Sequence, residues 1–141
     1  MTAVVDAGVL YALVDRADPA HPLAVEALEG ETEAIVVPQV ALPEICYLIG
    51  SRIGSSEETA FVRYLAESDW RLEPLTNGDI ERIVALLAEH AAAGLGFVGA
   101  AVVALAERMG ATRIYTLNPT HFERVRPTHA ERFEIRPPVT A

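Results

Sequence analysis

Short apolar runs alternate with longer segments of helical periodicity along the whole chain. Apolar runs bounded by polar or turn-forming residues predict strands at about residues 3–5, 34–37, 70–75, 113–117 and, as a short edge strand, 133–135. Apolar side chains that recur every three or four positions predict helices at about 9–14, 23–28, 43–53, 55–67, 79–92 and 99–109. Because strands and helices alternate, the pattern predicts right-handed crossovers and a mainly parallel sheet, which is the α/β fold class.

Residues with strong positional preferences mark the starts of several helices. Ser55 and Ser56 are expected to cap the helix at 55–67, and Asn77 is expected to be the N-cap of the helix at 79–92. The nearly all-apolar helix that follows is expected to begin at Gly99. One stripe of the helix at 79–92 is expected to face the core, and it consists of Ile80, Ile83, Val84 and Leu87.

The size and composition of the chain predict one globular domain. The chain has 141 residues, of which 51% are hydrophobic and 22% are charged, so it can bury a full core. We find no internal repeat and no linker, and we therefore expect a single domain over residues 1–141, with a frayed tail at about 137–141.

The charged residues exclude some classes of protein and leave others open. The formal net charge is −9, and all 11 cationic side chains are arginines. Without lysine the chain cannot form a P-loop, and it lacks the lysine expected of a receiver-type phosphoacceptor domain. The acidity argues against a passive nucleic-acid-binding protein, because phosphate neutralisation requires a basic face. It is compatible with a nuclease that has an acidic metal pocket and an arginine rim.

Three further features point to a protein of the cytoplasm that does not enter a membrane. The single cysteine, Cys46, excludes an intramolecular disulfide and a zinc site made only of cysteines. The first six residues lack the basic stretch of a signal peptide. The longest uncharged run, 91–106, is too short to span a bilayer comfortably and contains three glycines.

Four positions far apart in the sequence are expected to meet at one edge of the sheet. Asp6 and Asn118 follow predicted strands, while Glu44 and Gly99 lie near the starts of predicted helices. In open α/β sheets, ligands bind outside the carboxyl ends of the strands. Oxygen ligands without histidine or thiolate suit Mg²⁺ or Mn²⁺, and the chemistry that fits is phosphodiester hydrolysis. Taken singly, each position also has an ordinary structural explanation, as a helix cap, a solvated side chain or a turn.

Four segments, in this order and at these separations, resemble the PIN-domain ribonucleases of the VapC toxin type over nearly the whole chain. They are Val4–Ala12, Pro43–Leu48, Gly96–Ala100 and Ile114–Phe122. The resemblance implies a three-layer α/β/α sandwich with a central, mainly parallel sheet. It also implies a Mg²⁺-dependent endoribonuclease that acts on RNA and is held in check by a small cognate antitoxin protein.

The resemblance assigns the family's acidic residues to positions that only partly keep them. The first acid of the family falls on Asp6 and the second on Glu44, whereas the third falls on Gly99 and the fourth on Asn118. Thr116, at the position of the family's small hydroxyl residue before the fourth acid, is retained. On this basis the catalytic residues are expected to be Asp6, Glu44, Asn118 and Thr116, with Asp6 and Glu44 as the metal ligands and Gly99 at the lost ligand position.

With two carboxylates in place of four, we expect only weak binding of Mg²⁺ or Mn²⁺. Mg²⁺ commonly uses one or two carboxylates together with water and substrate phosphate, so binding assisted by substrate is conceivable. Asn118 could add a carbonyl oxygen, and His121 is an additional candidate near the pocket. Asp79 or Glu123 could replace a lost acid, although nothing in the spacing supports either.

The sequence leaves two functions open. The first is a VapC-like ribonuclease toxin whose activity is weakened or lost through Gly99 and Asn118. The alternative is a catalytically inactive PIN domain that binds a protein or RNA. A change at Gly99 made deliberately to silence a toxic protein is a third explanation, but Ala7, where the family often has Thr or Ser, and Asn118 favour drift.

Contacts with RNA, if any, are expected at an arginine rim. Arg113, Arg124 and Arg126 flank the predicted fourth strand and the loop after it. They could equally be solvated, or paired with Glu107 and Glu123. A homodimer is also conceivable, since the apolar helix at 45–53 could form its interface, but such a stripe more often belongs to the core.

Overall fold

A parallel sheet of five strands in the order β3-β2-β1-β4-β5 forms the centre of the molecule. The computed structural model describes residues 1–137. The strands are β1 (Thr2–Val5), β2 (Ala34–Pro38), β3 (Arg71–Glu73), β4 (Arg113–Tyr115) and β5 (Glu134–Arg136). Every pairing in the sheet is parallel, and all the strands predicted from the sequence are present.

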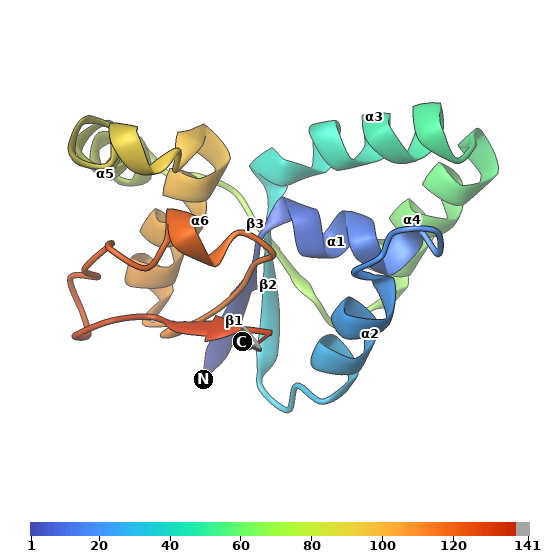
Figure 1. The fold of residues 1–141 in the computed structure, drawn as a ribbon, viewed down its shortest axis with the longest axis horizontal. Coiled ribbons are helices and arrows are strands. Elements are labelled where there is room, and N and C mark those ends of the chain that lie inside the picture. The colour runs from blue at the N-terminus through green and yellow to red at the C-terminus, as the bar shows by residue number, and fades with distance from the viewer. Residues whose placement is uncertain (138–141) are drawn as a thin grey trace.

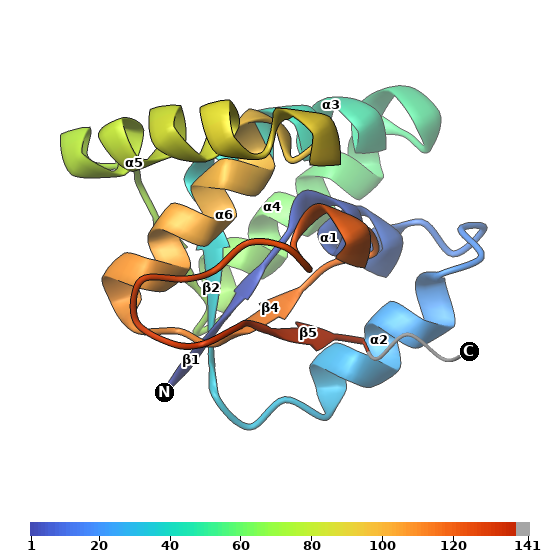
Figure 2. The same cartoon turned by 60° about the vertical axis from the view of Figure 1, so that its left-hand side comes forward.

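Helices cover both faces of this sheet, as Figures 1 and 2 show. One face is covered by α1 (Ala7–Val14), α2 (His21–Glu29), α3 (Leu42–Arg52) and α4 (Ser55–Glu67). The other is covered by α5 (Asn77–Glu89) and α6 (Gly96–Met109). Short 3₁₀ turns are η1 (Gln39–Ala41), η2 (Ala91–Ala93) and η3 (Pro119–His121). The predicted three-layer α/β/α sandwich is confirmed, and among residues 1–137 every helix is too short or too polar to cross a lipid bilayer.

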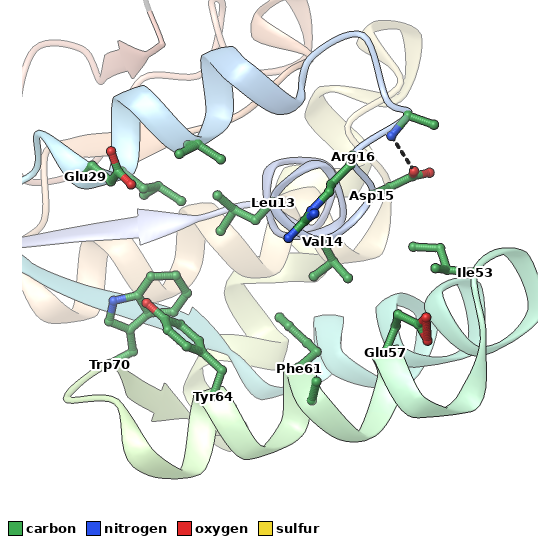
Figure 3. Close-up of a pocket in the computed structure, with 14 residues that line it drawn as sticks. Leu13, Val14, Asp15, Arg16, Glu29, Ile53, Glu57, Phe61, Tyr64 and Trp70 are labelled. Carbon is green, nitrogen blue, oxygen red and sulfur yellow. Dashed lines mark hydrogen bonds between the residues drawn. The ribbon is translucent and has the colours of Figure 1, made fainter.

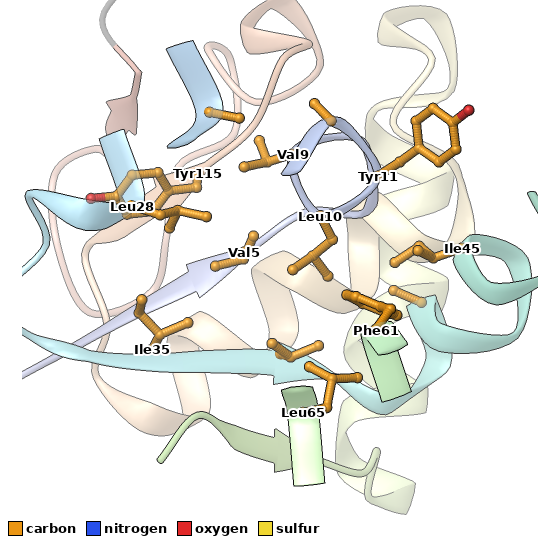
Figure 4. Packing of buried hydrophobic residues seen from close by; sticks show 14 of the residues in the cluster. Val5, Val9, Leu10, Tyr11, Leu28, Ile35, Ile45, Phe61, Leu65 and Tyr115 are labelled. Carbon is orange, nitrogen blue, oxygen red and sulfur yellow. The ribbon is translucent and has the colours of Figure 1, made fainter. Parts of the chain in front are cut away.

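Residues 3–5 of strand β1 are buried on both faces of the sheet, which explains why all three are apolar. Ala3 and Val5 pack into the cluster beneath α1–α4, whereas Val4 points into the cluster beneath α5 and α6 (Figure 4 shows the first cluster). Successive side chains of a strand point to opposite faces, and a parallel sheet covered on both sides therefore requires continuous apolar runs. Ile45 and Ile49 of α3 also belong to the first cluster, so the stripe considered as a dimer face is core.

The direction of strand addition reverses at β1. Strands β2 and β3 lie on one side of β1, and β4 and β5 lie on the other. A crevice for ligands opens at the carboxyl ends of the strands where the order reverses. Asp6 follows β1 and Thr116 follows β4, so the fold places both residues beside this crevice.

The start of α5 differs from the prediction. Thr76, not Asn77, is the N-cap: the Thr76 hydroxyl accepts the N–H of Asp79 at 3.1 Å, and the Asp79 carboxylate accepts the N–H of Thr76 at 2.9 Å. Only this register puts an acid at the third helical position, where it completes a reciprocal capping box. The buried face of the helix also differs from the prediction: Ile83 and Leu86 are buried, whereas Ile80 and Val84 of the predicted stripe are exposed. Ser55 and Ser56 likewise do not cap α4, whose N-cap is Gly54 with no side-chain hydrogen bond.

Helix α6 begins about one turn earlier than predicted. It starts at Gly96, so Gly99 lies inside the first turn and is buried. Gly94 and Gly96 adopt positive φ angles of 72° and 68°, which allow the chain to turn sharply into the helix without a polar cap. The apolar run before Gly99 contains no capping residue, and the sequence therefore gave no signal for the earlier start.

Arg108 holds two buried carboxylates together at the far end of α6. Its guanidinium donates to Glu73 at 2.9 Å, to Asp79 at 3.1 Å and to the carbonyl of Pro74 at 3.1 Å. The hydrogen bond from Arg108 holds the pKa of Glu73 below its ordinary value. Burial alone would raise the pKa of Asp79, but hydrogen bonds from Arg108 and from the N–H of Thr76 bring it below the ordinary value.

We expect Arg108→Met to destabilise the fold at pH 7 by about 2–3 kcal/mol, because it leaves two buried carboxylates without their charged donor. Both acids have lowered pKa values in the folded state, so their contribution is present above the unfolded pKa and is lost as the pH falls through the folded pKa. The difference between wild type and variant should therefore shrink below about pH 4. Chemical denaturation across pH measures it. Arg71→Met is the matched control, since Arg71 also pairs with Glu73 but is largely exposed and should cost less than about 1 kcal/mol.

Candidate functional site

One pocket at the carboxyl edge of the sheet brings the four predicted positions together. The pocket has a volume of about 510 Å³. Asp6, Glu44, Gly99 and Asn118 all lie on its wall. The remaining wall is formed by Ala7, Gly8, Tyr11, Ile45, Leu48, Gly94, Leu95, Gly96, Phe97, Val98 and His121. Two strand ends and the first turns of α3 and α6 therefore converge as the sequence predicted.

Asp6 is both the N-cap of α1 and the buried carboxylate of the pocket. Its Oδ1 accepts the N–H of Ala7 at 2.9 Å, and its Oδ2 accepts the hydroxyl of Thr116 at 2.8 Å. The Thr116 hydroxyl in turn accepts the backbone N–H of Asn118 at 3.0 Å. Each carboxylate oxygen has a second lone pair, so these hydrogen bonds fix the orientation of the carboxylate and leave acceptor capacity on both oxygens.

Burial has the largest effect on the pKa of Asp6. The residue is only 8% exposed, and removal from water raises its pKa, with a smaller contribution in the same direction from the charge of Glu44. Hydrogen bonds from Thr116 and Ala7 and the proximity of His121 oppose the shift without cancelling it. A raised carboxyl pKa means that the ionised carboxylate is disfavoured, so a positive charge placed nearby would stabilise it.

Glu44 and Asn118 stand at the solvent edge of the pocket. Glu44 lies in the first turn of α3, where the positive end of the helix dipole favours a carboxylate, and its side chain is exposed. Asn118 is exposed as well, and its backbone N–H is the group that contacts Thr116. The amide side chain has no charge to offer, so the carboxylates of the pocket are those of Asp6 and Glu44.

Gly99 faces a space that neighbouring apolar side chains have closed. A Cβ added at Gly99 would lie 3.1 Å from Cδ1 of Leu95 and 3.7 Å from Cζ of Phe122. The first distance is shorter than an ordinary van der Waals contact, so the Leu95 methyl would have to move by a few tenths of an ångström. The glycine is therefore not an open N-cap position, and a carboxylate there would require local repacking.

The residues present fit a weakly held divalent cation rather than a closed metal cage. Within residues 1–137, no three His, Cys, Asp or Glu side chains are grouped so as to hold a metal ion. Asp79 is hydrogen-bonded to Thr76 and Arg108, and Glu123 is not on the pocket wall, so neither adds a third carboxylate to the pocket. Two carboxylates and an amide oxygen still suit Mg²⁺, which keeps most of its waters in proteins.

The three predicted RNA-contacting arginines differ in their surroundings. Arg113 lies at the amino end of β4 and is held by ion pairs to Glu31 at 2.7 Å and Glu134 at 3.0 Å. These are not the partners considered from the sequence, since Glu107 pairs with Arg82 instead. Because Arg113 is occupied and lies at the opposite end of its strand from the pocket, a role in RNA binding is not supported for it.

Arg124 and Arg126 keep the properties that an RNA contact requires. Both are exposed in the segment after η3, and neither forms an ion pair with any of residues 1–137. Their contact with RNA stays a prediction.

A second, larger hollow was not foreseen from the sequence. It has a volume of about 980 Å³ and lies between α1, α2 and α4 (Figure 3). Trp70 and Tyr64 meet at one end of it with their rings edge to face, 5.3 Å between centroids. Its charged rim consists of Asp15, Arg16, Glu29 and Glu57. The one sequence signal was Tyr64, an aromatic residue of α4 beyond those that a single buried face needs.

Comparison with known proteins agrees with the fold. Residues 3–126 match the PIN domain family. Ribonuclease VapC26 of Mycobacterium tuberculosis is 31% identical over 134 residues, covering 95% of this chain and 99% of that protein.

Solved structures share the fold at lower sequence identity. Mycobacterium tuberculosis VapC20, a Sarcin-Ricin loop cleaving toxin, superimposes with a TM-score of 0.73 at 21% identity, over 79% of this chain and 86% of that one. A toxin–antitoxin complex from Klebsiella pneumoniae gives 0.66 at 21% identity, over 87% and 92%. VapBC2 of Rickettsia felis, bound to a DNA fragment from its promoter, gives 0.66 at 15% identity, over 96% and 98%. Because the PIN match spans most of the chain and the 31% identity extends over nearly all of VapC26, this chain belongs to the PIN-domain family, in the group of the VapC toxins.

Proposed function

We propose that the chain is the toxin of a toxin–antitoxin pair, a divalent-metal-dependent endoribonuclease whose site is weakened by Gly99 and Asn118. The observation that carries the proposal is the oriented Asp6 carboxylate, which Thr116 fixes in one pocket with Glu44. The similarity to ribonuclease VapC26 supports RNA as the substrate.

Each polar residue of the pocket has a distinct role in this proposal. Asp6 and Glu44 would hold Mg²⁺ or Mn²⁺, and the raised pKa of Asp6 means that a cation would stabilise its ionised form. When bound, such an ion supplies positive charge opposite a phosphodiester and lowers the pKa of water. Thr116 keeps Asp6 in place, and Asn118 is available to orient a water or a phosphate oxygen by hydrogen bonding.

An inactive module that binds RNA or protein is the alternative. The observation that favours it is the Leu95 methyl beside Gly99, which occupies the space where a third carboxylate would begin. Cleavage of RNA by the unmodified chain separates the two functions.

We also propose that the hollow between α2 and α4 receives an apolar segment of the cognate antitoxin. The solved relatives include toxin–antitoxin complexes, which supports a protein partner of this kind. Three carboxylates and one arginine line the rim, so the hollow favours an apolar segment flanked by basic residues.

Restoring the acids should raise both metal affinity and RNA cleavage. We expect Gly99→Asp and Asn118→Asp each to tighten Mg²⁺ binding by about tenfold, with non-additive effects because they share one ion. Gly99→Asp should also lower the melting temperature without metal, since it displaces the Leu95 methyl. Calorimetric Mg²⁺ titration and cleavage of a mixed RNA pool, with and without chelator, provide the measurements.

Gly99→Asn is the control for shape, because it has the same volume as aspartate and no charge. It should reproduce the loss of stability and none of the gain in affinity. A wild type as active as the double mutant would contradict a weakened site. A double mutant that folds and binds Mg²⁺ but does not cleave RNA would contradict the proposed nuclease.

Replacing Asp6 should stabilise the metal-free protein while abolishing its response to metal. The pKa of Asp6 is raised in the folded protein, so the fold favours the neutral carboxyl group. The ionised carboxylate therefore destabilises the fold at a pH above the folded-state pKa. This destabilisation disappears as the pH falls to the pKa of the unfolded state. Asp6→Asn should therefore raise the melting temperature in chelator at pH 7 by about 2–4 °C, with a smaller gain at pH 4. Excess Mg²⁺ should stabilise the wild type but not the variant.

Glu44→Gln serves as the comparison, since Glu44 is exposed and its neutralisation should leave the metal-free melting temperature unchanged. A melting temperature for Asp6→Asn below that of the wild type at pH 7 would show that its two hydrogen bonds outweigh its desolvation.

Blocking the larger hollow should separate antitoxin binding from nuclease activity. Ala60 is exposed within the hollow, so Ala60→Arg should fill it and abolish co-purification with the product of the gene directly upstream, leaving Mg²⁺ binding unchanged. Val62→Arg is the control, because Val62 is exposed on the same helix outside the hollow. Equal retention of the upstream product by both variants would place its binding elsewhere.

A further inference from the structure

The charge distribution of this chain is unfavourable for holding RNA by its phosphates. The net charge is −9, and the chain contains no lysine. Five of the 11 arginines are committed to carboxylates within residues 1–137, namely Arg71, Arg82, Arg108, Arg113 and Arg136. A sixth, Arg52, lies over the ring of Tyr11 at 5.5 Å. An RNA ligand of the acidic pocket must therefore gain much of its affinity from something other than phosphate neutralisation.

Two exposed aromatic rings lie close to that pocket, one on α6 and one on α3. Phe97 lies on the wall itself, in the first turn of α6, and is 47% exposed. Tyr47 is 72% exposed on α3. It is three residues after Glu44 and one before Leu48, both of which lie on the pocket wall, so helical spacing places Tyr47 at the outer rim of that wall. Figure 1 shows α3 and α6 beginning at the same end of the sheet.

Most other aromatic rings are buried or already in contact with another ring. Phe61, Phe122 and Phe133 are buried in the core, and Tyr64, the third exposed ring within residues 1–137, packs edge to face on Trp70. Tyr11 and Tyr115 are buried, and each donates its hydroxyl to an acceptor. Tyr47 and Phe97 are instead exposed, Phe97 on the wall of the pocket and Tyr47 three residues after Glu44 on α3.

We propose that Tyr47 and Phe97 are stacking platforms for the bases of single-stranded RNA beside the acidic pocket. The inference rests on the proposed function, since it takes RNA as the ligand, and it adds how this acidic protein binds that ligand. Stacking on an aromatic ring is available to every base, requires no positive charge and needs unpaired bases. It therefore favours a loop or single strand over a duplex, with the phosphate between two stacked bases directed toward Asp6 and Glu44.

The salt dependence of binding follows from the same argument. Single-stranded RNA loses affinity with a log–log slope of about −0.7 for each neutralised phosphate. If Arg124 and Arg126 are the arginines that contact phosphates, the slope should be no steeper than about −1.4. A binder that relied on phosphate contacts along the strand would show a much steeper slope.

The test measures the affinity of a labelled eight-nucleotide single-stranded RNA in chelator, where neither metal binding nor cleavage contributes. Tyr47→Leu and Phe97→Leu keep an apolar side chain but remove the ring, and each should weaken binding about tenfold. Tyr47→Phe and Phe97→Tyr keep the ring and should bind like the wild type. Tyr64→Leu is the matched control, because Tyr64 is 53% exposed on α4 beside the other hollow and should leave RNA binding unchanged.

An abasic oligomer of the same length and charge completes the design. The wild type should bind it about as weakly as the double leucine variant binds the normal RNA. If the wild type binds normal and abasic RNA equally, RNA remains the ligand and stacking is wrong. If it binds neither, the proposed function fails with it. If the leucine variants change the oligomeric state in light scattering while RNA affinity stays constant, Tyr47 and Phe97 form an interface between protein chains instead.

Discussion

The desolvation of one carboxylate organises the pocket of this protein. Asp6 is carried into a buried position because β1 is apolar on both faces and ends at the point where the strand order reverses. The first N–H of α1 and the hydroxyl of Thr116 compensate part of the penalty, and the pKa nevertheless stays raised. Asp6 is thus a carboxylate in a buried position that disfavours its charge. It is oriented there by the start of α1 and by the residue after β4. Such an arrangement is typical of functional sites.

The sequence predicted well those features that depend on periodicity and on parallel topology. Continuous apolar runs identified β1 and β2, and the rule that ligands bind at carboxyl ends brought Asp6, Glu44 and Asn118 to one edge before their contacts were known. The assignment of their roles drew on the resemblance to the PIN-domain family. The start of α6 was missed because two glycines with positive φ angles, rather than a polar cap, begin that helix. The cap of α5 was missed because the reciprocal partner at Asp79, and not the propensity of Asn77, decided the register.

Ion-pair partners and hollows were beyond prediction for a different reason. The pairing of Arg113 with Glu31 joins residues 82 positions apart, and the large hollow is bounded by three helices whose relative placement is set only by packing on the sheet. Neither the ion pair nor the hollow produces a pattern among residues that are neighbours in the sequence. The ion pairs nevertheless have a consequence for the charge: five of the 11 arginines are paired with carboxylates within residues 1–137, which reduces the positive charge that this acidic chain can offer to a polyanion. Under the proposed function, recognition of RNA would therefore depend on ring surfaces more than on electrostatic attraction.

The contact between Leu95 and the position of the missing Cβ at Gly99 also has an evolutionary meaning. A side chain at position 99 would begin 3.1 Å from Cδ1 of Leu95 and 3.7 Å from Cζ of Phe122, so the residues allowed at these three positions depend on one another. A carboxylate at position 99 would therefore be accommodated most easily together with a smaller side chain at position 95. In evolutionary terms, an acid here is best acquired through two coordinated substitutions rather than one.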